Sequence, residues 1–167
     1  YSADRAETFQ ITAELIQKGV VPREVNLKVY NCYTQDRMRL LGYCISEGLH
    51  VIPECHTAFI TLSKDRLKKY QYTDGDTEGV VNYPLSIKGI VFAVLFLEKD
   101  DHVKLSFRSK GDFAVNEFAK KYFNGGGHKN ASGGQTTQSL LEAISTFKKH
   151  LPEYSNELIH VAQAFNV

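Results

Sequence analysis

A chain of 167 residues is long enough for one ordinary domain, or for one domain with a few elements of a neighbour. Apolar residues make up 43% of the sequence and charged residues 23%, which is typical of globular proteins and argues against a disordered or fibrous chain. The net charge is only +1, so a globally basic field is excluded and any nucleic-acid binding must come from a local patch.

The first third of the chain is predicted to be helical. Apolar residues recur at helical spacing over residues 6–16, Ser2 can cap that helix, and Gly19 ends it. Pro22 stands where a second helix would begin, and a third helix is expected over residues 34–48. The apolar face of the third helix would consist of Met38, Leu41 and Ile45.

From about residue 50 the pattern changes to alternating strands and helices, which predicts an α/β fold. The expected elements are strands at 58–62, 89–99 and 102–109, and helices at 63–69, at 113–123, from Ser139 and after Pro152. Segment 89–99 is apolar at odd and even positions, so we expect it at the centre of a mixed sheet flanked by helices. It is much shorter than the roughly 20 residues of a membrane-spanning helix, so no membrane contact is expected.

The strand at 102–109 has two unlike faces. Val103, Leu105 and Phe107 alternate with Lys104, Ser106 and Arg108. Successive side chains of a strand project to opposite faces, so the second set gives this strand a polar face.

A glycine-rich loop, GGGHKNASGG at residues 125–134, carries the clearest chemical signal. Three consecutive glycines, Gly125 to Gly127, allow the backbone to turn sharply and to bring its N–H groups against a phosphate. His128 adds two ring nitrogens, and Lys129 and Asn130 add a cation and an amide at an expected helix N-terminus, whose dipole favours an anion. The small residues that follow leave a floor for a ligand.

Two interpretations of this loop compete. A flexible glycine turn between two helices, with His128 merely exposed, is the common reason for such sequences. A phosphate-binding loop better explains the histidine, the second run of small residues and the preceding strand with a polar face. One charge-assisted contact from Arg108 to a phosphate contributes about 1.5 to 3 kcal/mol, so a few such contacts suffice for micromolar binding.

This loop and the preceding segment KLSFRSK, residues 104–110, together resemble the DHHA1 substrate-binding domain of the DHH phosphoesterase superfamily. Within that superfamily the chain is similar to the bacterial oligoribonuclease and pAp-phosphatase group, called NrnA-like or exopolyphosphatase-related. Residues 1–48 look like the helical end of the DHH domain with its linker helix, and residues 49–167 look like the DHHA1 domain. The chain departs from the family at Ser132, which replaces a usual alanine, and a hydroxyl there could tune ligand contact.

The resemblance implies a substrate-binding site and no catalytic residue in this chain. Arg108 and His128 would bind a substrate phosphate, supported by the neighbouring backbone. The complete predicted site is Ser106, Arg108, Gly125, Gly126, Gly127, His128, Lys129 and Asn130.

Members of the superfamily are expected to hold two Mn²⁺ ions with Asp and His ligands, and this chain lacks the Asp-His-His triad. Its opening residues, Tyr1 and Ser2, look like the pair that follows the last metal-binding aspartate. The cluster at residues 100–102 lies in an expected turn, and residues 74–85 match a calcium loop except for Leu85, where a Glu is required. No metal is therefore expected here, and two Mn²⁺ ions are expected on the missing DHH domain.

The chain is thus predicted to be the substrate-binding part of a cytoplasmic, Mn²⁺-dependent phosphoesterase, inactive alone, that acts on short oligoribonucleotides or pAp. Its partners would be a short RNA or nucleotide phosphate, the missing DHH domain and, as a further option, a second copy of the chain. Two alternatives stay open, a stand-alone nucleic-acid-binding module and a purely structural dimerisation domain. Cations that could follow a nucleic-acid backbone are Lys64, Arg66, Lys68, Lys69, Lys120 and Lys121.

Overall fold

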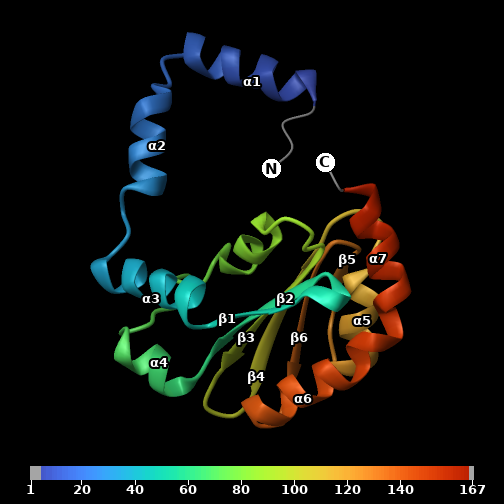
Figure 1. Cartoon of the computed structure of the whole chain (residues 1–167). Helices are drawn as coiled ribbons and strands as arrows, with labels where there is room; N and C mark the ends of the chain where they lie inside the picture. Colours follow the sequence, from blue (N-terminus) through green and yellow to red (C-terminus); the bar gives the residue numbers. More distant parts are fainter. Residues whose placement is uncertain (1–4, 166–167) are drawn as a thin grey trace. The chain divides into compact units, whose positions relative to one another are not determined.

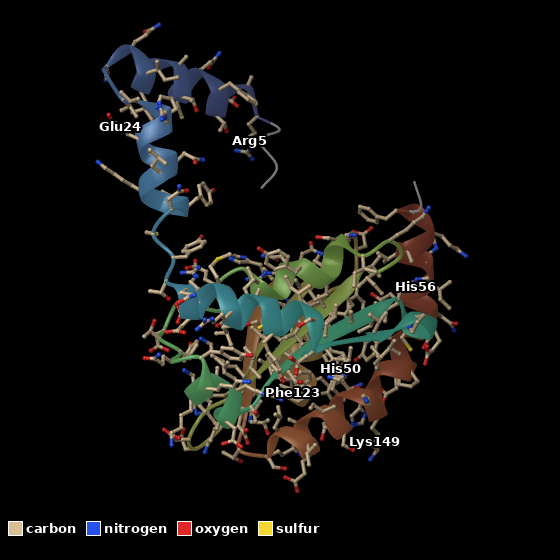
Figure 2. All side chains as sticks on the ribbon, turned by 60° about the vertical axis from the view of Figure 1, so that its left-hand side comes forward. Arg5, Glu24, His50, His56, Phe123 and Lys149 are labelled. Atoms are coloured by element: carbon tan, nitrogen blue, oxygen red, sulfur yellow. The ribbon has the colours of Figure 1, made fainter. Side chains whose placement is uncertain are left out.

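The computed structural model describes residues 5–165, and the chain separates into two units, Tyr1–Gln35 and Asp36–Val167. The first unit contains α1 (Ala6–Gln17) and α2 (Pro22–Tyr30), as predicted, and none of the residues of these two helices is buried. Their side chains stand in the open around the ribbon in Figure 2. Arg5 occupies the cap position of α1, whereas the predicted cap Ser2, like Tyr1, lies outside the described residues.

Residues 49–136 supply a six-stranded mixed sheet, which confirms the predicted α/β fold. In spatial order its strands are β1 (Leu49–Ile52), β2 (Thr57–Leu62), β3 (Phe92–Glu98), β4 (Val103–Ser109), β6 (Ala131–Thr136) and β5 (Gly126–His128). β2 and β3 run parallel, and the other neighbouring pairs are antiparallel. As predicted, β3 lies inside the sheet and is buried along nearly all its length.

The helices of the second unit lie on both sides of the sheet (Figure 1). They are α3 (Gln35–Ser46), α4 (Lys64–Lys69), α5 (Val115–Tyr122), α6 (Leu140–His150) and α7 (Ser155–Ala164), with short 3-10 helices η1 (Pro53–Cys55), η2 (Val80–Ser86) and η3 (Leu151–Tyr154). The predicted capping box of α6 is present, because Ser139 accepts the N–H of Glu142 and the Glu142 carboxylate accepts the N–H of Ser139.

One face of the sheet is closed by α5, α6 and α7 around an aromatic core. Phe92 and Phe107 project to this face from β3 and β4 and are fully buried. Phe118 of α5 and Phe147 of α6 meet Phe92 with ring centroids 5.5 Å and 5.8 Å apart. This close-packed core holds β4 in a defined position, so the side chains on the opposite face of β4 also have defined positions.

The other face is covered only in part. Leu95 of β3 and Ile60 of β2 belong to a second buried cluster with residues of α3, α4 and η2. In α3 the buried residues are Leu40 and Cys44, and the predicted Leu41 packs partly buried against the same cluster. The other two residues of the predicted apolar face were wrong, since Met38 is 52% exposed and Ile45 is 42% exposed. Apolar residues stand at many positions of α3, and more than one stripe satisfies a helical spacing. The predicted division after residue 48 concerns family domains and stays a prediction.

Candidate functional site

The polar face of β4 continues into an uncovered part of the sheet made by β6 and β5. Arg108 of β4 pairs with Ala131 of β6, and Ala131 pairs with His128 of β5. Residues paired across strands project to the same face, so the three side chains form one row. Neighbouring strands lie about 4.8 Å apart, which places the Cα atoms of Arg108 and His128 about 10 Å from each other. Ala131 places only a methyl group between the two side chains.

A second row lies two residues further along the strands, on the same face, and its residues have even smaller side chains. Ser106 of β4 pairs with Gly133, and Gly133 pairs with Gly126 of β5. A Cβ atom added to Gly126 would meet nothing within 4 Å, and one added to Gly133 would meet only the Leu105 carbonyl, at 3.7 Å. Of the small residues predicted to leave a floor, Ala131 and Gly133 therefore lie on this open face, whereas Gly134 packs against Phe123 on the other face.

Ser132 points away from this floor. It is buried, and its hydroxyl donates to the carbonyl oxygen of Val115 at 3.1 Å. The expectation that this hydroxyl tunes ligand contact was wrong, because alternate residues of β6 face opposite sides of the sheet.

The glycine-rich loop is a β-hairpin and not the start of a helix. β5 and β6 form an antiparallel pair, with Lys129 and Asn130 in the turn between them. The predicted helix N-terminus at these two residues was therefore wrong, and no helix dipole acts there. Glycine-rich strands lack the β-branched and aromatic residues from which a strand is predicted.

Gly125 has a structural role in packing the start of the hairpin against α5 and β6. Its N–H donates to the carbonyl oxygen of Ala119 at 3.1 Å, so this group is engaged at the end of α5. A Cβ atom at this position would lie 2.2 Å from the carbonyl oxygen of Gly133, a separation that atoms do not reach without movement of the backbone. Gly127 has a φ of +140° that favours glycine. A phosphate contact from the backbone of Gly126 and Gly127 stays a prediction.

The side chains of Lys129 and Asn130 already have protein partners. Lys129 Nζ lies 2.6 Å from Oδ1 of Asp112, and the hydrogen bond from Lys129 lowers the pKa of that carboxyl group. Asn130 Nδ2 donates to Ser109 Oγ at 2.9 Å and to the Gly111 carbonyl at 2.8 Å. These contacts fasten the hairpin turn to the last residue of β4 and to the segment that follows it, which holds β5 in register with Arg108.

Arg108 and His128 have no carboxylate partner within residues 5–165. The guanidinium group donates to the carbonyl oxygen of the preceding residue, Phe107, at 2.8 Å and is only partly exposed. His128 is exposed at the edge of the sheet. A guanidinium group without a carboxylate partner, beside an open floor, suits a phosphate or a carboxylate ligand.

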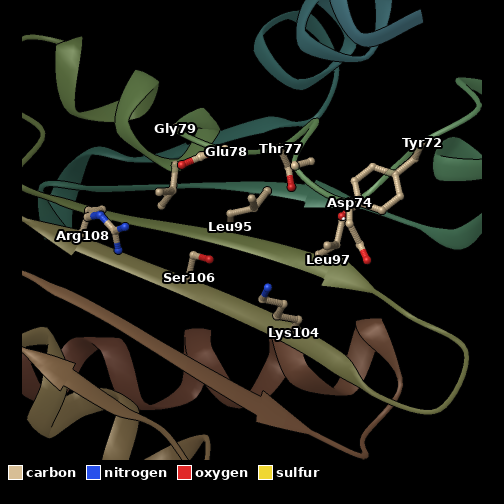
Figure 3. Close-up of a pocket in the computed structure, with 12 residues that line it drawn as sticks. Tyr72, Asp74, Thr77, Glu78, Gly79, Leu95, Leu97, Lys104, Ser106 and Arg108 are labelled. Carbon is tan, nitrogen blue, oxygen red and sulfur yellow. Dashed lines mark hydrogen bonds between the residues drawn. The ribbon is translucent and has the colours of Figure 1, made fainter. Parts of the chain in front are cut away.

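A hollow of about 510 Å³ lies against the same face of β4 (Figure 3). Lys104, Ser106 and Arg108 line one side of it, and residues 72–81 line the other. Sequence reasoning missed this second wall. It compared these residues only with a calcium loop and did not relate them to β4. Asp74 instead accepts hydrogen bonds from Lys99, at 3.1 Å, and from Tyr72, and these two contacts lower its pKa in that order. No local pattern reveals a contact between residues 25 positions apart.

Residues 5–165 contain no group of three or more His, Cys, Asp and Glu side chains that could hold a metal ion. Asp101 and His102 form an exposed pair 2.7 Å apart in the turn before β4, and the hydrogen bond from His102 lowers the pKa of Asp101. Cys55 is the last residue of η1, and the next residue, His56, has a left-handed backbone. Over the same residues, every helix is too short or too polar to span a membrane.

The DHHA1 domain family matches residues 56–157, a range that contains β4, β5 and β6. The chain belongs to the DHHA1 domain family. It is 40% identical over 127 residues to the bifunctional oligoribonuclease and PAP phosphatase NrnA of Bacillus subtilis, with 76% of this chain and 39% of that protein covered. It is 33% identical over 147 residues to a probable NrnA of Streptococcus mutans, with 85% of this chain and 44% of that protein covered.

A solved structure of an exopolyphosphatase-related protein from Bacteroides fragilis has the same fold. Its TM-score is 0.90 at 40% identity, over 95% of this chain and 46% of that one. This chain therefore spans less than half the length of the relatives that it matches. The resemblance inferred from the loop and from residues 104–110 is confirmed.

Proposed function

We propose that this chain is the substrate-binding part of a cytoplasmic phosphoesterase that hydrolyses short oligoribonucleotides or pAp. The row Arg108–Ala131–His128 would hold a phosphate of that substrate. The observation that carries the proposal is this row, in which two nitrogen-bearing side chains that have no carboxylate partner among residues 5–165 flank a floor of small residues. The similarity to NrnA proteins supports the substrate class, and the incomplete coverage of those relatives supports a binding part.

Each residue of the site has a distinct task in this proposal. Arg108 supplies a planar guanidinium group that can donate two parallel hydrogen bonds to one phosphate. His128 donates a ring N–H from the opposite side, and Ser106 donates its hydroxyl from the next row. A phosphate fixed in this way, away from the bond to be cleaved, orients the rest of the substrate. We assign no proton transfer to these residues.

The Mn²⁺ ions of the proposed phosphoesterase do not fit the residues described here, because no suitable ligand group exists among them. We place the two ions on a DHH domain outside this sequence, and the reaction on that domain. Lys129 and Asn130, which were predicted as ligand contacts, are proposed to position the hairpin, since both side chains are held by the segment after β4.

The test is the Arg108→Ala variant in the full-length protein, with a ribodinucleotide and pAp as substrates. The loss of a charge-assisted contact to phosphate is expected to lower kcat/KM on the order of tenfold to a hundredfold. The control is Arg39→Ala, which is expected to leave kcat/KM unchanged, because that exposed guanidinium group lies on α3, 3.7 Å from the carboxylate of Asp36. Unchanged kinetics in Arg108→Ala would remove the proposed role.

A further inference from the structure

The hollow beside β4 has two walls of opposite charge. The β4 wall presents Lys104, Ser106 and Arg108. Figure 3 shows Thr77 and Glu78 along the facing wall. The floor between the walls is apolar, since Leu95 and Leu97 of β3 line it together with Val81. An anion is favoured at one wall only.

The acidic wall is held in place by contacts to the end of β3. Lys99 Nζ lies 3.1 Å from Asp74 Oδ1 and 4.4 Å from the ring centroid of Tyr72. The carboxylate of Asp76 accepts the N–H of Thr73 at 2.8 Å. The segment that leads to Glu78 therefore has a defined position relative to β4.

The two acidic residues that line the hollow differ in their partners. The charge of Asp74 is offset by Lys99. Among the described residues, the carboxylate of Glu78 has neither a cation nor a hydrogen-bond donor as a partner, and the residue is exposed. Glu78 is thus an acceptor free to meet a ligand.

We propose that Glu78 determines specificity, by selecting a nucleoside over a further phosphate as the neighbour of the phosphate held by Arg108. This inference rests on the proposed function of the Arg108–Ala131–His128 row. A carboxylate accepts hydrogen bonds from the hydroxyl groups of a ribose or from the exocyclic amine of a base. The same carboxylate repels an anion such as a further phosphate group.

The floor of the hollow can accommodate the same ligand. Leu95, Leu97 and Val81 line it and are each at most 4% exposed, so a base placed against them gains van der Waals contact. A hollow of about 510 Å³ lies within the size range of sites for small organic ligands. Inorganic polyphosphate carries a charge on every unit, has no apolar surface and offers the carboxylate no donor of its own. The site therefore favours a nucleotide over polyphosphate.

The experiment is an NMR titration of the 167-residue chain with adenosine monophosphate and, separately, with tripolyphosphate. In Glu78→Gln the affinity for adenosine monophosphate is expected to fall about threefold to tenfold, and the affinity for tripolyphosphate to rise by a similar factor. Glu157→Gln, on α7 behind the aromatic core, is the matched control and leaves both affinities unchanged.

Two analogues identify the donor that Glu78 recognises. The Glu78→Gln effect disappears with the deoxyribose nucleotides if a ribose hydroxyl is the donor, and with inosine monophosphate if the amine is the donor. An effect that persists with every analogue would contradict the hydrogen bond, and with it the proposal.

Arg108→Ala separates this inference from the proposed function. If Arg108→Ala weakens both ligands while Glu78→Gln changes neither or shifts both alike, the phosphate site stands and the specificity inference fails. If Arg108→Ala leaves both affinities unchanged, the phosphate site itself is contradicted.

Discussion

Phe107 and Arg108 are neighbours in β4 and lie in opposite surroundings. Phe107 is fully buried on the face that α5, α6 and α7 close, whereas Arg108 lies on the face that is open toward β6 and β5. β6 repeats the contrast, since Ser132 is buried and hydrogen-bonded while Gly133 is exposed. The strands thus use one face for stability and the other for binding, and substitutions on the two faces should have separable effects.

The largest effect on stability is expected from Phe107→Ala. The ring of Phe107 lies 5.8 Å from that of Phe123 and 6.1 Å from that of Phe118, and its removal leaves a cavity in the closed core. We expect the free energy of unfolding to fall by about 3–5 kcal/mol, measured by chemical denaturation. Arg108→Ala should change it by less than about 0.5 kcal/mol. Equal losses in the two variants would break the contrast between the faces.

A pair of glycine substitutions sharpens the comparison within the hairpin. Gly125→Ala places a Cβ atom 2.2 Å from a carbonyl oxygen and is expected to cost about 1–3 kcal/mol of stability. Gly133→Ala has its nearest neighbour at 3.7 Å and should stay within about 0.5 kcal/mol of the wild type. Thermal denaturation of the two variants measures both effects. A destabilised Gly133→Ala variant would show that the floor is packed and not open.

The smallest effect concerns the rim of the closed face, where Glu153 joins η3 to α5 and α6. Hydrogen bonds from His150, at 2.6 Å, and then from Tyr122, at 2.8 Å, lower the pKa of Glu153 to about 2 from its usual 4.5. Because the folded state lowers this pKa, the stabilisation is present above about pH 4.5 and is lost as the pH falls toward 2.

Glu153→Gln should therefore show a shallower loss of stability between pH 4.5 and 2 than the wild type. Denaturation curves recorded across this range provide the measurement. Tyr122→Phe, which removes one of the two donors, should lie between them, and identical slopes for all three proteins would rule out the contact as the cause.

The sequence predicted those parts of the fold that have strong local patterns. The alternation in residues 102–109 identified β4 and assigned Arg108 to the polar face, because the period of two depends only on neighbouring residues. The capping box at Ser139 and Glu142 located the start of α6 for the same reason. The central position of β3 followed from apolar residues on both of its faces.

The pairing of strands that are far apart in the sequence could not be predicted from such local patterns. β5 and β6 are rich in glycine, so neither propensity nor alternation distinguishes them from a turn. The row that joins Arg108 to His128 depends on the register of three strands, and a shift of one residue would move His128 to the other face. The position of the wall at Asp74 depends on the ion pair between Asp74 and Lys99, and no sequence pattern near either residue indicates that contact.

A phosphate site on the open face of the sheet is tested most directly by an NMR titration of this chain with a ribodinucleotide, with and without Mn²⁺. We predict weak, metal-independent binding that shifts the amides of Ser106, Arg108, Gly126, His128 and Gly133 and that is lost in Arg108→Ala. Shifts confined to the closed face, or no shifts at millimolar ligand, would contradict a phosphate site on the open face of the sheet.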